Sequence, residues 1–266
     1  YVEEPNMIMT STLELLSFVA TDRGLNGDKI RYMICDELRE AVAPHIDKFL
    51  TSTEENSRFV LEQYALGILN LYGLLPYTEF LKQLTGYLKG SMTKDEIAKG
   101  LSNSMLMRQL TFDIEDIYNS VMYVRSPLLL EVEDLEERLY AHRAIKSLKK
   151  FTIEEVLSAG TMPVFYISNP HSDQLKGFMM RKLGYNEELA EAKIQWLWYA
   201  IQMDENPMSA IVSAIDTKVL SMQELQEVVG IAVNYCNDCP RWFLKGHSST
   251  EASALLGRGE SVKTPP

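Results

Sequence analysis

Cysteine is scarce in this chain of 266 residues, which carries three, at positions 35, 236 and 239. A small and odd number of cysteines excludes a disulfide framework, because such frameworks need several paired cysteines in a short chain. Long apolar runs are also absent. The longest, Val228 to Val233, is interrupted by a glycine, whereas a membrane span needs about 20 apolar residues. We therefore expect a cytoplasmic protein without a membrane segment.

Basic charge is in short supply as well. The chain has 26 Lys and Arg against 37 Asp and Glu, a formal net charge of -11 and an isoelectric point near 5.0. Nucleic-acid binding needs a basic surface, which here would have to be local. As a helix, His142–Lys150 would place three basic side chains along one side, although the alternative is a solvated face that offsets the acidic run before it. The candidates for nucleic-acid contact are Arg143, Lys146, Lys150, Lys94 and Lys99.

Common catalytic and nucleotide-binding motifs are missing too. The chain contains no GxxxxGK[ST], no GxGxxG after a strand, no GxSxG and no HExxH. Acidic clusters such as Asp113, Glu115 and Asp116 arise by chance in a chain with 37 acidic residues. We therefore assign no catalytic residue and no cofactor, and we expect a protein that is not an enzyme.

Helical patterns dominate what is present. The N-terminal region, residues 1–73, is predicted to hold helices over 10–21, 26–50 and 58–73, with Ser52 and Glu55 forming a capping box before the third. The central region, residues 74–130, is predicted to hold a helix over 74–88 and a second helix that begins with a Thr93–Glu96 capping box. Val121 to Val124 then favour a strand, as part of a short hairpin. Two helices followed by a strand pair are typical of a winged helix.

The C-terminal part is also predicted to be helical. An acidic run, Glu131 to Glu137, marks a boundary, and helices follow over 151–160, 171–184, 186–202 and 221–239. We expect a C-terminal helical domain over 131–256 and a disordered tail over 257–266. The predicted fold is therefore mainly α, a helical bundle with a central winged-helix-like module carrying a short β-hairpin.

The segment YCNDCPRWFLKGHSSTE, residues 235–251, carries the most pointed chemical pattern. Cys236, Cys239 and His247 are three candidate zinc ligands, but tetrahedral zinc usually takes four and no fourth is evident. A redox pair is disfavoured at a helix C-terminus, where the dipole raises the thiol pKa. The alternative is that both cysteines are small buried hydrophobic residues. We also expect Trp242 and Phe243 to be buried anchors beside a chain reversal at Gly246, with Ser248 or Ser249 capping a last helix.

The same segment resembles a signature of uncharacterised bacterial helical proteins, which reads Asn, polar, Pro, x, Trp, x, x, Lys/Arg-Gly-His, Thr/Ser, x, x, Glu. Many of those proteins carry a small zinc-binding SEC-C motif after the signature. The stretches YALGILNLYGLLPYTEFLKQL, FTIEEVLSAG and SNPHSDQLKGFMMRKLG fit the same family more loosely. The resemblance implies an intracellular bacterial protein and assigns it no biochemical role. The SEC-C segment is absent here and the family has polar residues in place of Cys236 and Cys239, so zinc binding is not carried over.

Three functions are consistent with these observations. The leading hypothesis is a non-enzymatic interaction or regulatory protein that binds another protein. The first alternative is a DNA-binding regulator that uses the central module, and the second is a zinc-binding protein that uses Cys236, Cys239 and His247.

Overall fold

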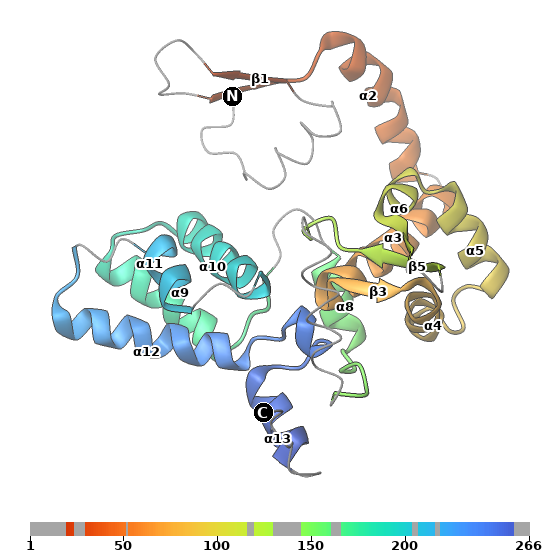
Figure 1. Ribbon diagram of the computed structural model, residues 1–266. Helices are drawn as coiled ribbons and strands as arrows, with labels where there is room; N and C mark the ends of the chain where they lie inside the picture. The colour runs from red at the N-terminus through yellow and green to blue at the C-terminus, as the bar shows by residue number, and fades with distance from the viewer. Residues whose placement is uncertain are drawn as a thin grey trace.

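The computed structural model describes residues 20–23, 30–51, 53–115, 120–129, 145–160, 166–203, 207–215 and 219–257. Over these residues the protein is mainly helical, with two small antiparallel sheets (Figure 1). The predicted fold class, mainly α with a short β-hairpin, is confirmed. None of the described helices is long and apolar enough to cross a membrane.

The first described elements are β1 (Ala20–Arg23), β2 (Ile30–Met33), α2 (Asp36–Thr51) and α3 (Thr53–Tyr72). The prediction of one helix over 26–50 is wrong at its start, because β2 pairs antiparallel with β1, Ala20 opposite Met33. Periodicity cannot separate a short strand from a helix when the pairing partner lies elsewhere in the chain. Pro44 lies inside α2 without dividing it. The predicted helix over 10–21 lies mostly outside the described residues. Ser52, predicted to cap the helix over 58–73, also lies outside them.

The central elements are β3 (Leu74–Pro76), α4 (Tyr77–Tyr87), α5 (Lys94–Asn103), α6 (Met105–Leu110), β4 (Thr111–Glu115) and β5 (Ser120–Arg125). The Thr93–Glu96 capping box is confirmed, and β4 and β5 form the expected hairpin. The helix predicted over 74–88 instead begins at Tyr77. Gly73, with φ of 73°, ends α3, and Leu74 and Leu75 then pair with β5. The sheet order is β3-β5-β4.

The C-terminal elements are α8 (Ile153–Ala159), α9 (Pro170–Lys182), α10 (Glu187–Gln202), α11 (Pro207–Ala214), α12 (Met222–Asp238), the 3-10 turn η2 (Trp242–Leu244) and α13 (Ser249–Gly257). Polar N-caps fix where several of them begin, because a side-chain oxygen accepts an otherwise unpaired backbone N–H. Thr152, Asn169, Asn186 and Ser221 act in this way. Helices α9 to α12 gather together, apart from α3 to α6, with the turn that follows α12 between the two groups and α13 below them (Figure 1).

One continuous core joins these two groups. Helix α3 lies at its centre, and Ala65, Ile68 and Leu69 on it are fully buried. Helix α8 approaches α3 so closely that a β-carbon at Gly67 would lie 1.9 Å from the backbone oxygen of Val156. Residues before position 73 therefore pack against residues after position 130, although boundaries between regions were predicted at both positions. The division of the chain into these regions stays a prediction.

Candidate functional site

Residues 239–251, here called the C-terminal corner, turn the chain back on itself after α12. Lys245 and Gly246 have left-handed backbone conformations, with φ of 56° and 81°. A β-carbon at Gly246 would lie 2.9 Å from the Phe151 ring, so this position needs glycine. Ser248 then caps α13, because its hydroxyl accepts the Glu251 N–H at 3.2 Å. The reversal and the cap expected from the sequence are confirmed, with Ser248 as the capping residue.

Trp242 connects the two helix groups through this corner. Its side chain is 1% exposed and its indole Nε1 donates to the backbone oxygen of Asn70 on α3, at 2.8 Å. Its backbone N–H donates to Oε1 of Gln202 on α10, at 3.0 Å. The indole also meets the Trp198 ring edge to face, with centroids 5.8 Å apart. The predicted anchoring role of Trp242 is therefore confirmed, and Phe243 beside it is buried too.

Residues 145–151, here called the strap, lie beside the corner and are not helical. Lys149 N–H donates to the Lys245 backbone oxygen at 3.0 Å, and Lys245 Nζ donates to the Ile145 backbone oxygen at 2.5 Å. The Tyr72 hydroxyl donates to the backbone oxygen of Lys149. The helix predicted over 142–150 is therefore wrong for 145–150, because the strap's backbone groups bond to the corner and to α3 rather than to one another.

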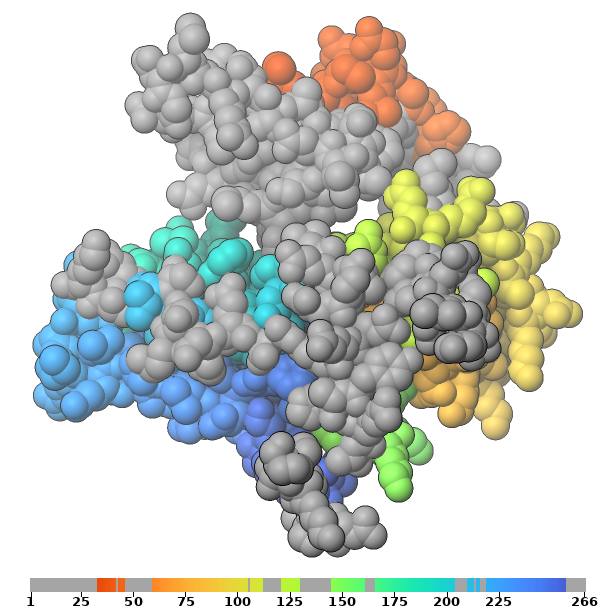
Figure 2. Space-filling view, in the orientation of Figure 1, coloured from red at the N-terminus to blue at the C-terminus, as the bar shows by residue number. Residues whose placement is uncertain are grey.

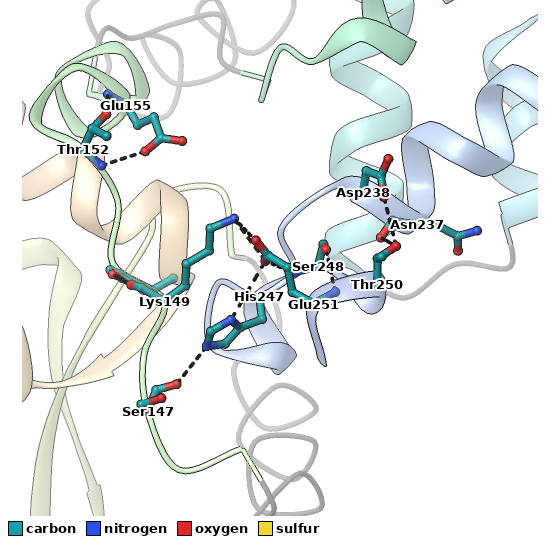
Figure 3. Close-up of polar contacts among 11 residues, drawn as sticks. Ser147, Lys149, Thr152, Glu155, Asn237, Asp238, His247, Ser248, Thr250 and Glu251 are labelled. Carbon is teal, nitrogen blue, oxygen red and sulfur yellow. Dashed lines mark hydrogen bonds and ion pairs between the residues drawn. The ribbon is translucent and has the colours of Figure 1, made fainter. Parts of the chain in front are cut away.

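A charged cluster closes this contact (Figure 3). Lys149 Nζ lies 2.8 Å from Oε1 of Glu251, and His247 Nε2 lies 3.2 Å from the backbone oxygen of Ser147. Burial by itself raises the pKa of the Glu251 carboxyl, but hydrogen bonds from Lys149 Nζ and the Ser248 N–H lower this pKa below its ordinary value. The Lys-Gly-His-Ser-x-x-Glu pattern thus serves to hold the strap.

The zinc hypothesis receives no support from the positions of its three residues. Cys236 and Cys239 are buried free thiols, and burial raises the pKa of Cys236 to about 11 and that of Cys239 to about 12. His247 is turned toward the strap and Glu251 instead. Within the described part of the chain, no group of three or more His, Cys, Asp or Glu is placed to hold a metal ion. Both cysteines are buried, as their interpretation as small hydrophobic residues requires.

The candidate nucleic-acid contacts do not gather into one described face. Lys146 and Lys150 are exposed on the non-helical strap, and Arg143 lies outside the described residues. Lys94 and Lys99 are exposed on α5, where Asp95 and Glu96 occupy the same first turn as Lys94. Acidic side chains therefore offset the basic charge at the start of this helix.

A groove on the central elements was missed by the sequence analysis. It encloses about 370 Å³ and is lined by Tyr77, Leu101, Ser102, Met107, Arg108, Thr111 and Met122. Leu101 and Met107 are buried, Met122 is 44% exposed, and Arg108 is the one charged member of this lining set. Five different elements supply these residues, so no single stretch of sequence signals the groove. Its chemistry suits an apolar side chain with a neighbouring carboxylate.

Comparisons with known proteins add nothing to the interpretation of the groove and the corner, which therefore rests on their own geometry. No family model, no curated protein and no solved structure matches the chain.

Proposed function

We propose that this protein is a non-enzymatic interaction module that binds a protein partner through the groove lined by Leu101, Met107, Arg108 and Met122. The groove itself is the observation that carries the proposal, because it combines a buried apolar floor with an exposed methionine and one arginine. Methionine-containing surfaces adapt to varied apolar partners. The arginine can orient a partner carboxylate by a charge-assisted hydrogen bond.

The proposal includes a winged-helix-like architecture for the central elements. Two features support it, namely the order α3, β3, α4, α5, β4, β5 along the chain and the strand order β3-β5-β4 in the sheet. The additional short helix α6 precedes the strand pair. In this architecture α5 and the β4–β5 hairpin form the surface that meets a partner, and both contribute to the groove.

DNA is the second candidate partner, favoured by that same element order. The charge distribution argues against it. Between positions 74 and 130, four Lys and two Arg are balanced by three Asp and three Glu, and DNA affinity depends on excess positive charge at the phosphates. We therefore place protein before DNA as the partner. We also propose a cytoplasmic location, on the strength of the few unpaired cysteines.

The test is a selection of displayed peptides against the whole chain, followed by affinity measurements using fluorescence anisotropy. We expect selected peptides to carry an apolar residue near an acidic one. Met122→Glu should abolish their binding, because it places a like charge beside the peptide carboxylate and a charged group in the groove. Met180→Glu, at a methionine of similar exposure on α9, should leave binding unchanged. Peptides that bind both variants equally, or no selected peptide at all, would overturn the proposal.

The same assay separates the DNA alternative. A labelled duplex should show no binding that falls steeply with salt, since that slope measures phosphate contacts. Salt-sensitive duplex binding that is lost on Lys94→Glu and Lys99→Glu would favour the DNA-binding function instead.

A further inference from the structure

The N-terminal arm, here defined as β2 and α2 (residues 30–51), contributes nothing to the described core. Of its described side chains between residues 33 and 45, that of Leu38 is half-buried and the others are exposed. The buried core of the described residues begins at Leu61. Two adjacent apolar side chains at the tip, Met33 and Ile34, are 52% and 55% exposed. The described side chains over 33–41 and 43–45 lie at the top of Figure 2, coloured red-orange.

The arm tip and the groove have complementary chemistry. The tip places Met33 and Ile34 just before Asp36 and Glu37, separated from them by Cys35, and both acidic side chains are exposed. Asp36 pairs with Arg39 at 2.8 Å, so Glu37 is the acidic group that the tip offers to the groove. The groove offers an apolar floor beside the exposed Arg108. Opposite charge next to matched apolar surface steers an encounter and fixes its register. The groove therefore suits the tip both in its apolar surface and in its charge.

The geometry of α2 keeps the tip away from the groove of its own chain. A helix of 16 residues is roughly 24 Å long at 1.5 Å per residue, and α2 joins the body at its C-terminal end, beside α3 (Figure 1). The tip is therefore held a helix length away from that junction. A second copy of the chain has no such restriction.

We propose that two copies of this chain associate, with the arm tip of each copy seated in the groove of the other. Such an exchange is self-complementary, because the same two surfaces meet twice about a two-fold axis. The inference rests on the proposed function, since it names the partner that the groove takes. The tip supplies the apolar residue and the carboxylate, with Glu37 facing Arg108.

A disulfide trap tests this contact directly. One chain keeps its natural Cys35, which is exposed at the arm tip, and the other carries Cys35→Ser with Ser102→Cys in the groove. Mixed under mild oxidation, the two chains should form a covalent heterodimer visible on a non-reducing gel. The matched control replaces Ser102→Cys with Ser158→Cys, an exposed serine on α8, and should give none. Equal cross-linking of Cys35 to the Ser102→Cys chain and to the Ser158→Cys chain, or cross-linking to neither chain, would overturn the inference.

Charge exchange provides an independent measurement by sedimentation equilibrium. Glu37→Arg and Arg108→Glu should each weaken the dimer roughly tenfold, and the double variant should return to within about threefold of the natural dissociation constant. The inference would be overturned if the natural chain stays monomeric at all concentrations, or if neither single variant weakens the dimer.

Failure of this inference can be distinguished from failure of the proposed function. Ile34→Glu places a charge on the apolar surface of the arm tip and leaves the groove intact, so it should abolish the dimer and retain binding of the selected peptides. A monomeric natural chain that still binds those peptides would reject the arm exchange alone. A chain that neither dimerises nor binds peptides would reject both.

Discussion

The N-terminal arm and the C-terminal corner contain similar residues in opposite environments. Each has a cysteine near two adjacent large apolar side chains, yet Met33 and Ile34 are more than half exposed whereas Trp242 and Phe243 are buried. Trp242 can be buried because its polar groups find partners, the indole Nε1 at the Asn70 backbone oxygen and the backbone N–H at Gln202. The comparison teaches that apolar content alone does not decide burial. The polar atoms that are buried together with the apolar side chains must also find hydrogen-bond partners.

The largest expected difference between the two regions is in thiol reactivity. In dilute protein at pH 8, Cys35 should react with a disulfide reagent at an ordinary rate, because it is exposed. Cys236 and Cys239 should react at least roughly 100-fold more slowly, since the thiolate is the reacting form and burial raises their pKa values. Absorbance during labelling should show one fast thiol, and three after denaturation. Three fast thiols in the folded protein would contradict the buried corner.

The next largest difference is in stability. Trp242→Ala should lower the free energy of unfolding by about 3–5 kcal/mol, because it leaves a cavity and removes the indole hydrogen bond to the Asn70 backbone oxygen. Ile34→Ala in the arm should change it by less than about 0.5 kcal/mol in dilute protein, as expected for an exposed side chain. Urea denaturation measures both. If Trp242→Ala and Ile34→Ala lowered the free energy of unfolding equally, the arm tip would be part of the monomer's core.

A smaller effect is expected at the chain reversal of the corner. Gly246→Ala should cost about 2–3 kcal/mol, because alanine resists a φ of 81° and its β-carbon would meet the Phe151 and Tyr72 rings. Gly184→Ala separates these two causes, since Gly184 has a φ of 69° with open space around it. That variant should lose about 1 kcal/mol. Equal losses on thermal unfolding would mean that packing at Gly246 contributes nothing.

The smallest effect concerns the ion pair between the corner and the strap. Glu251→Gln should cost less than about 1 kcal/mol at pH 7, because the Glu251 side chain is 42% exposed and solvent screens the pair. The folded-state pKa of Glu251 is lowered, so its contribution is complete above the unfolded pKa and is lost as pH falls through the folded value. The difference between variant and natural chain in urea should therefore narrow below about pH 4. Glu227→Gln, exposed on α12, is the control, and a gap that widens at low pH would contradict this assignment.

Much of the local structure could be predicted because its causes lie within a few residues. The capping box at Thr93 joins a residue to the one three positions later, and the reversal at Gly246 needs a residue that tolerates positive φ. The β4–β5 hairpin is also a local structure. These features were correctly read from the sequence because no distant partner competes for the same backbone groups.

Predictions failed where a partner far along the chain decided the outcome. Leu74 and Leu75 have a helical pattern, yet they pair with β5 about fifty residues later. The segment that holds Lys146 and Lys150 reads as a basic helix, but the backbone of Lys149 between them bonds to Lys245 and its amine bonds to Glu251. The family signature that the segment around Trp242 resembles drew attention to this segment but did not indicate its role. In the structure that segment holds the strap and joins α3 to α10.

The sequence by itself determined a mainly helical chain, the helix start capped by Thr93, and the chain reversal at Gly246. Only the tertiary structure decided that the corner would join two helix groups, that the strap would not be helical, and that side chains from five elements between Tyr77 and Met122 would line a groove. The physical reason is the distance along the chain between the groups that interact. Caps and turns satisfy backbone groups within one turn of chain, whereas the groove and the strap depend on which distant atoms become neighbours when the core forms.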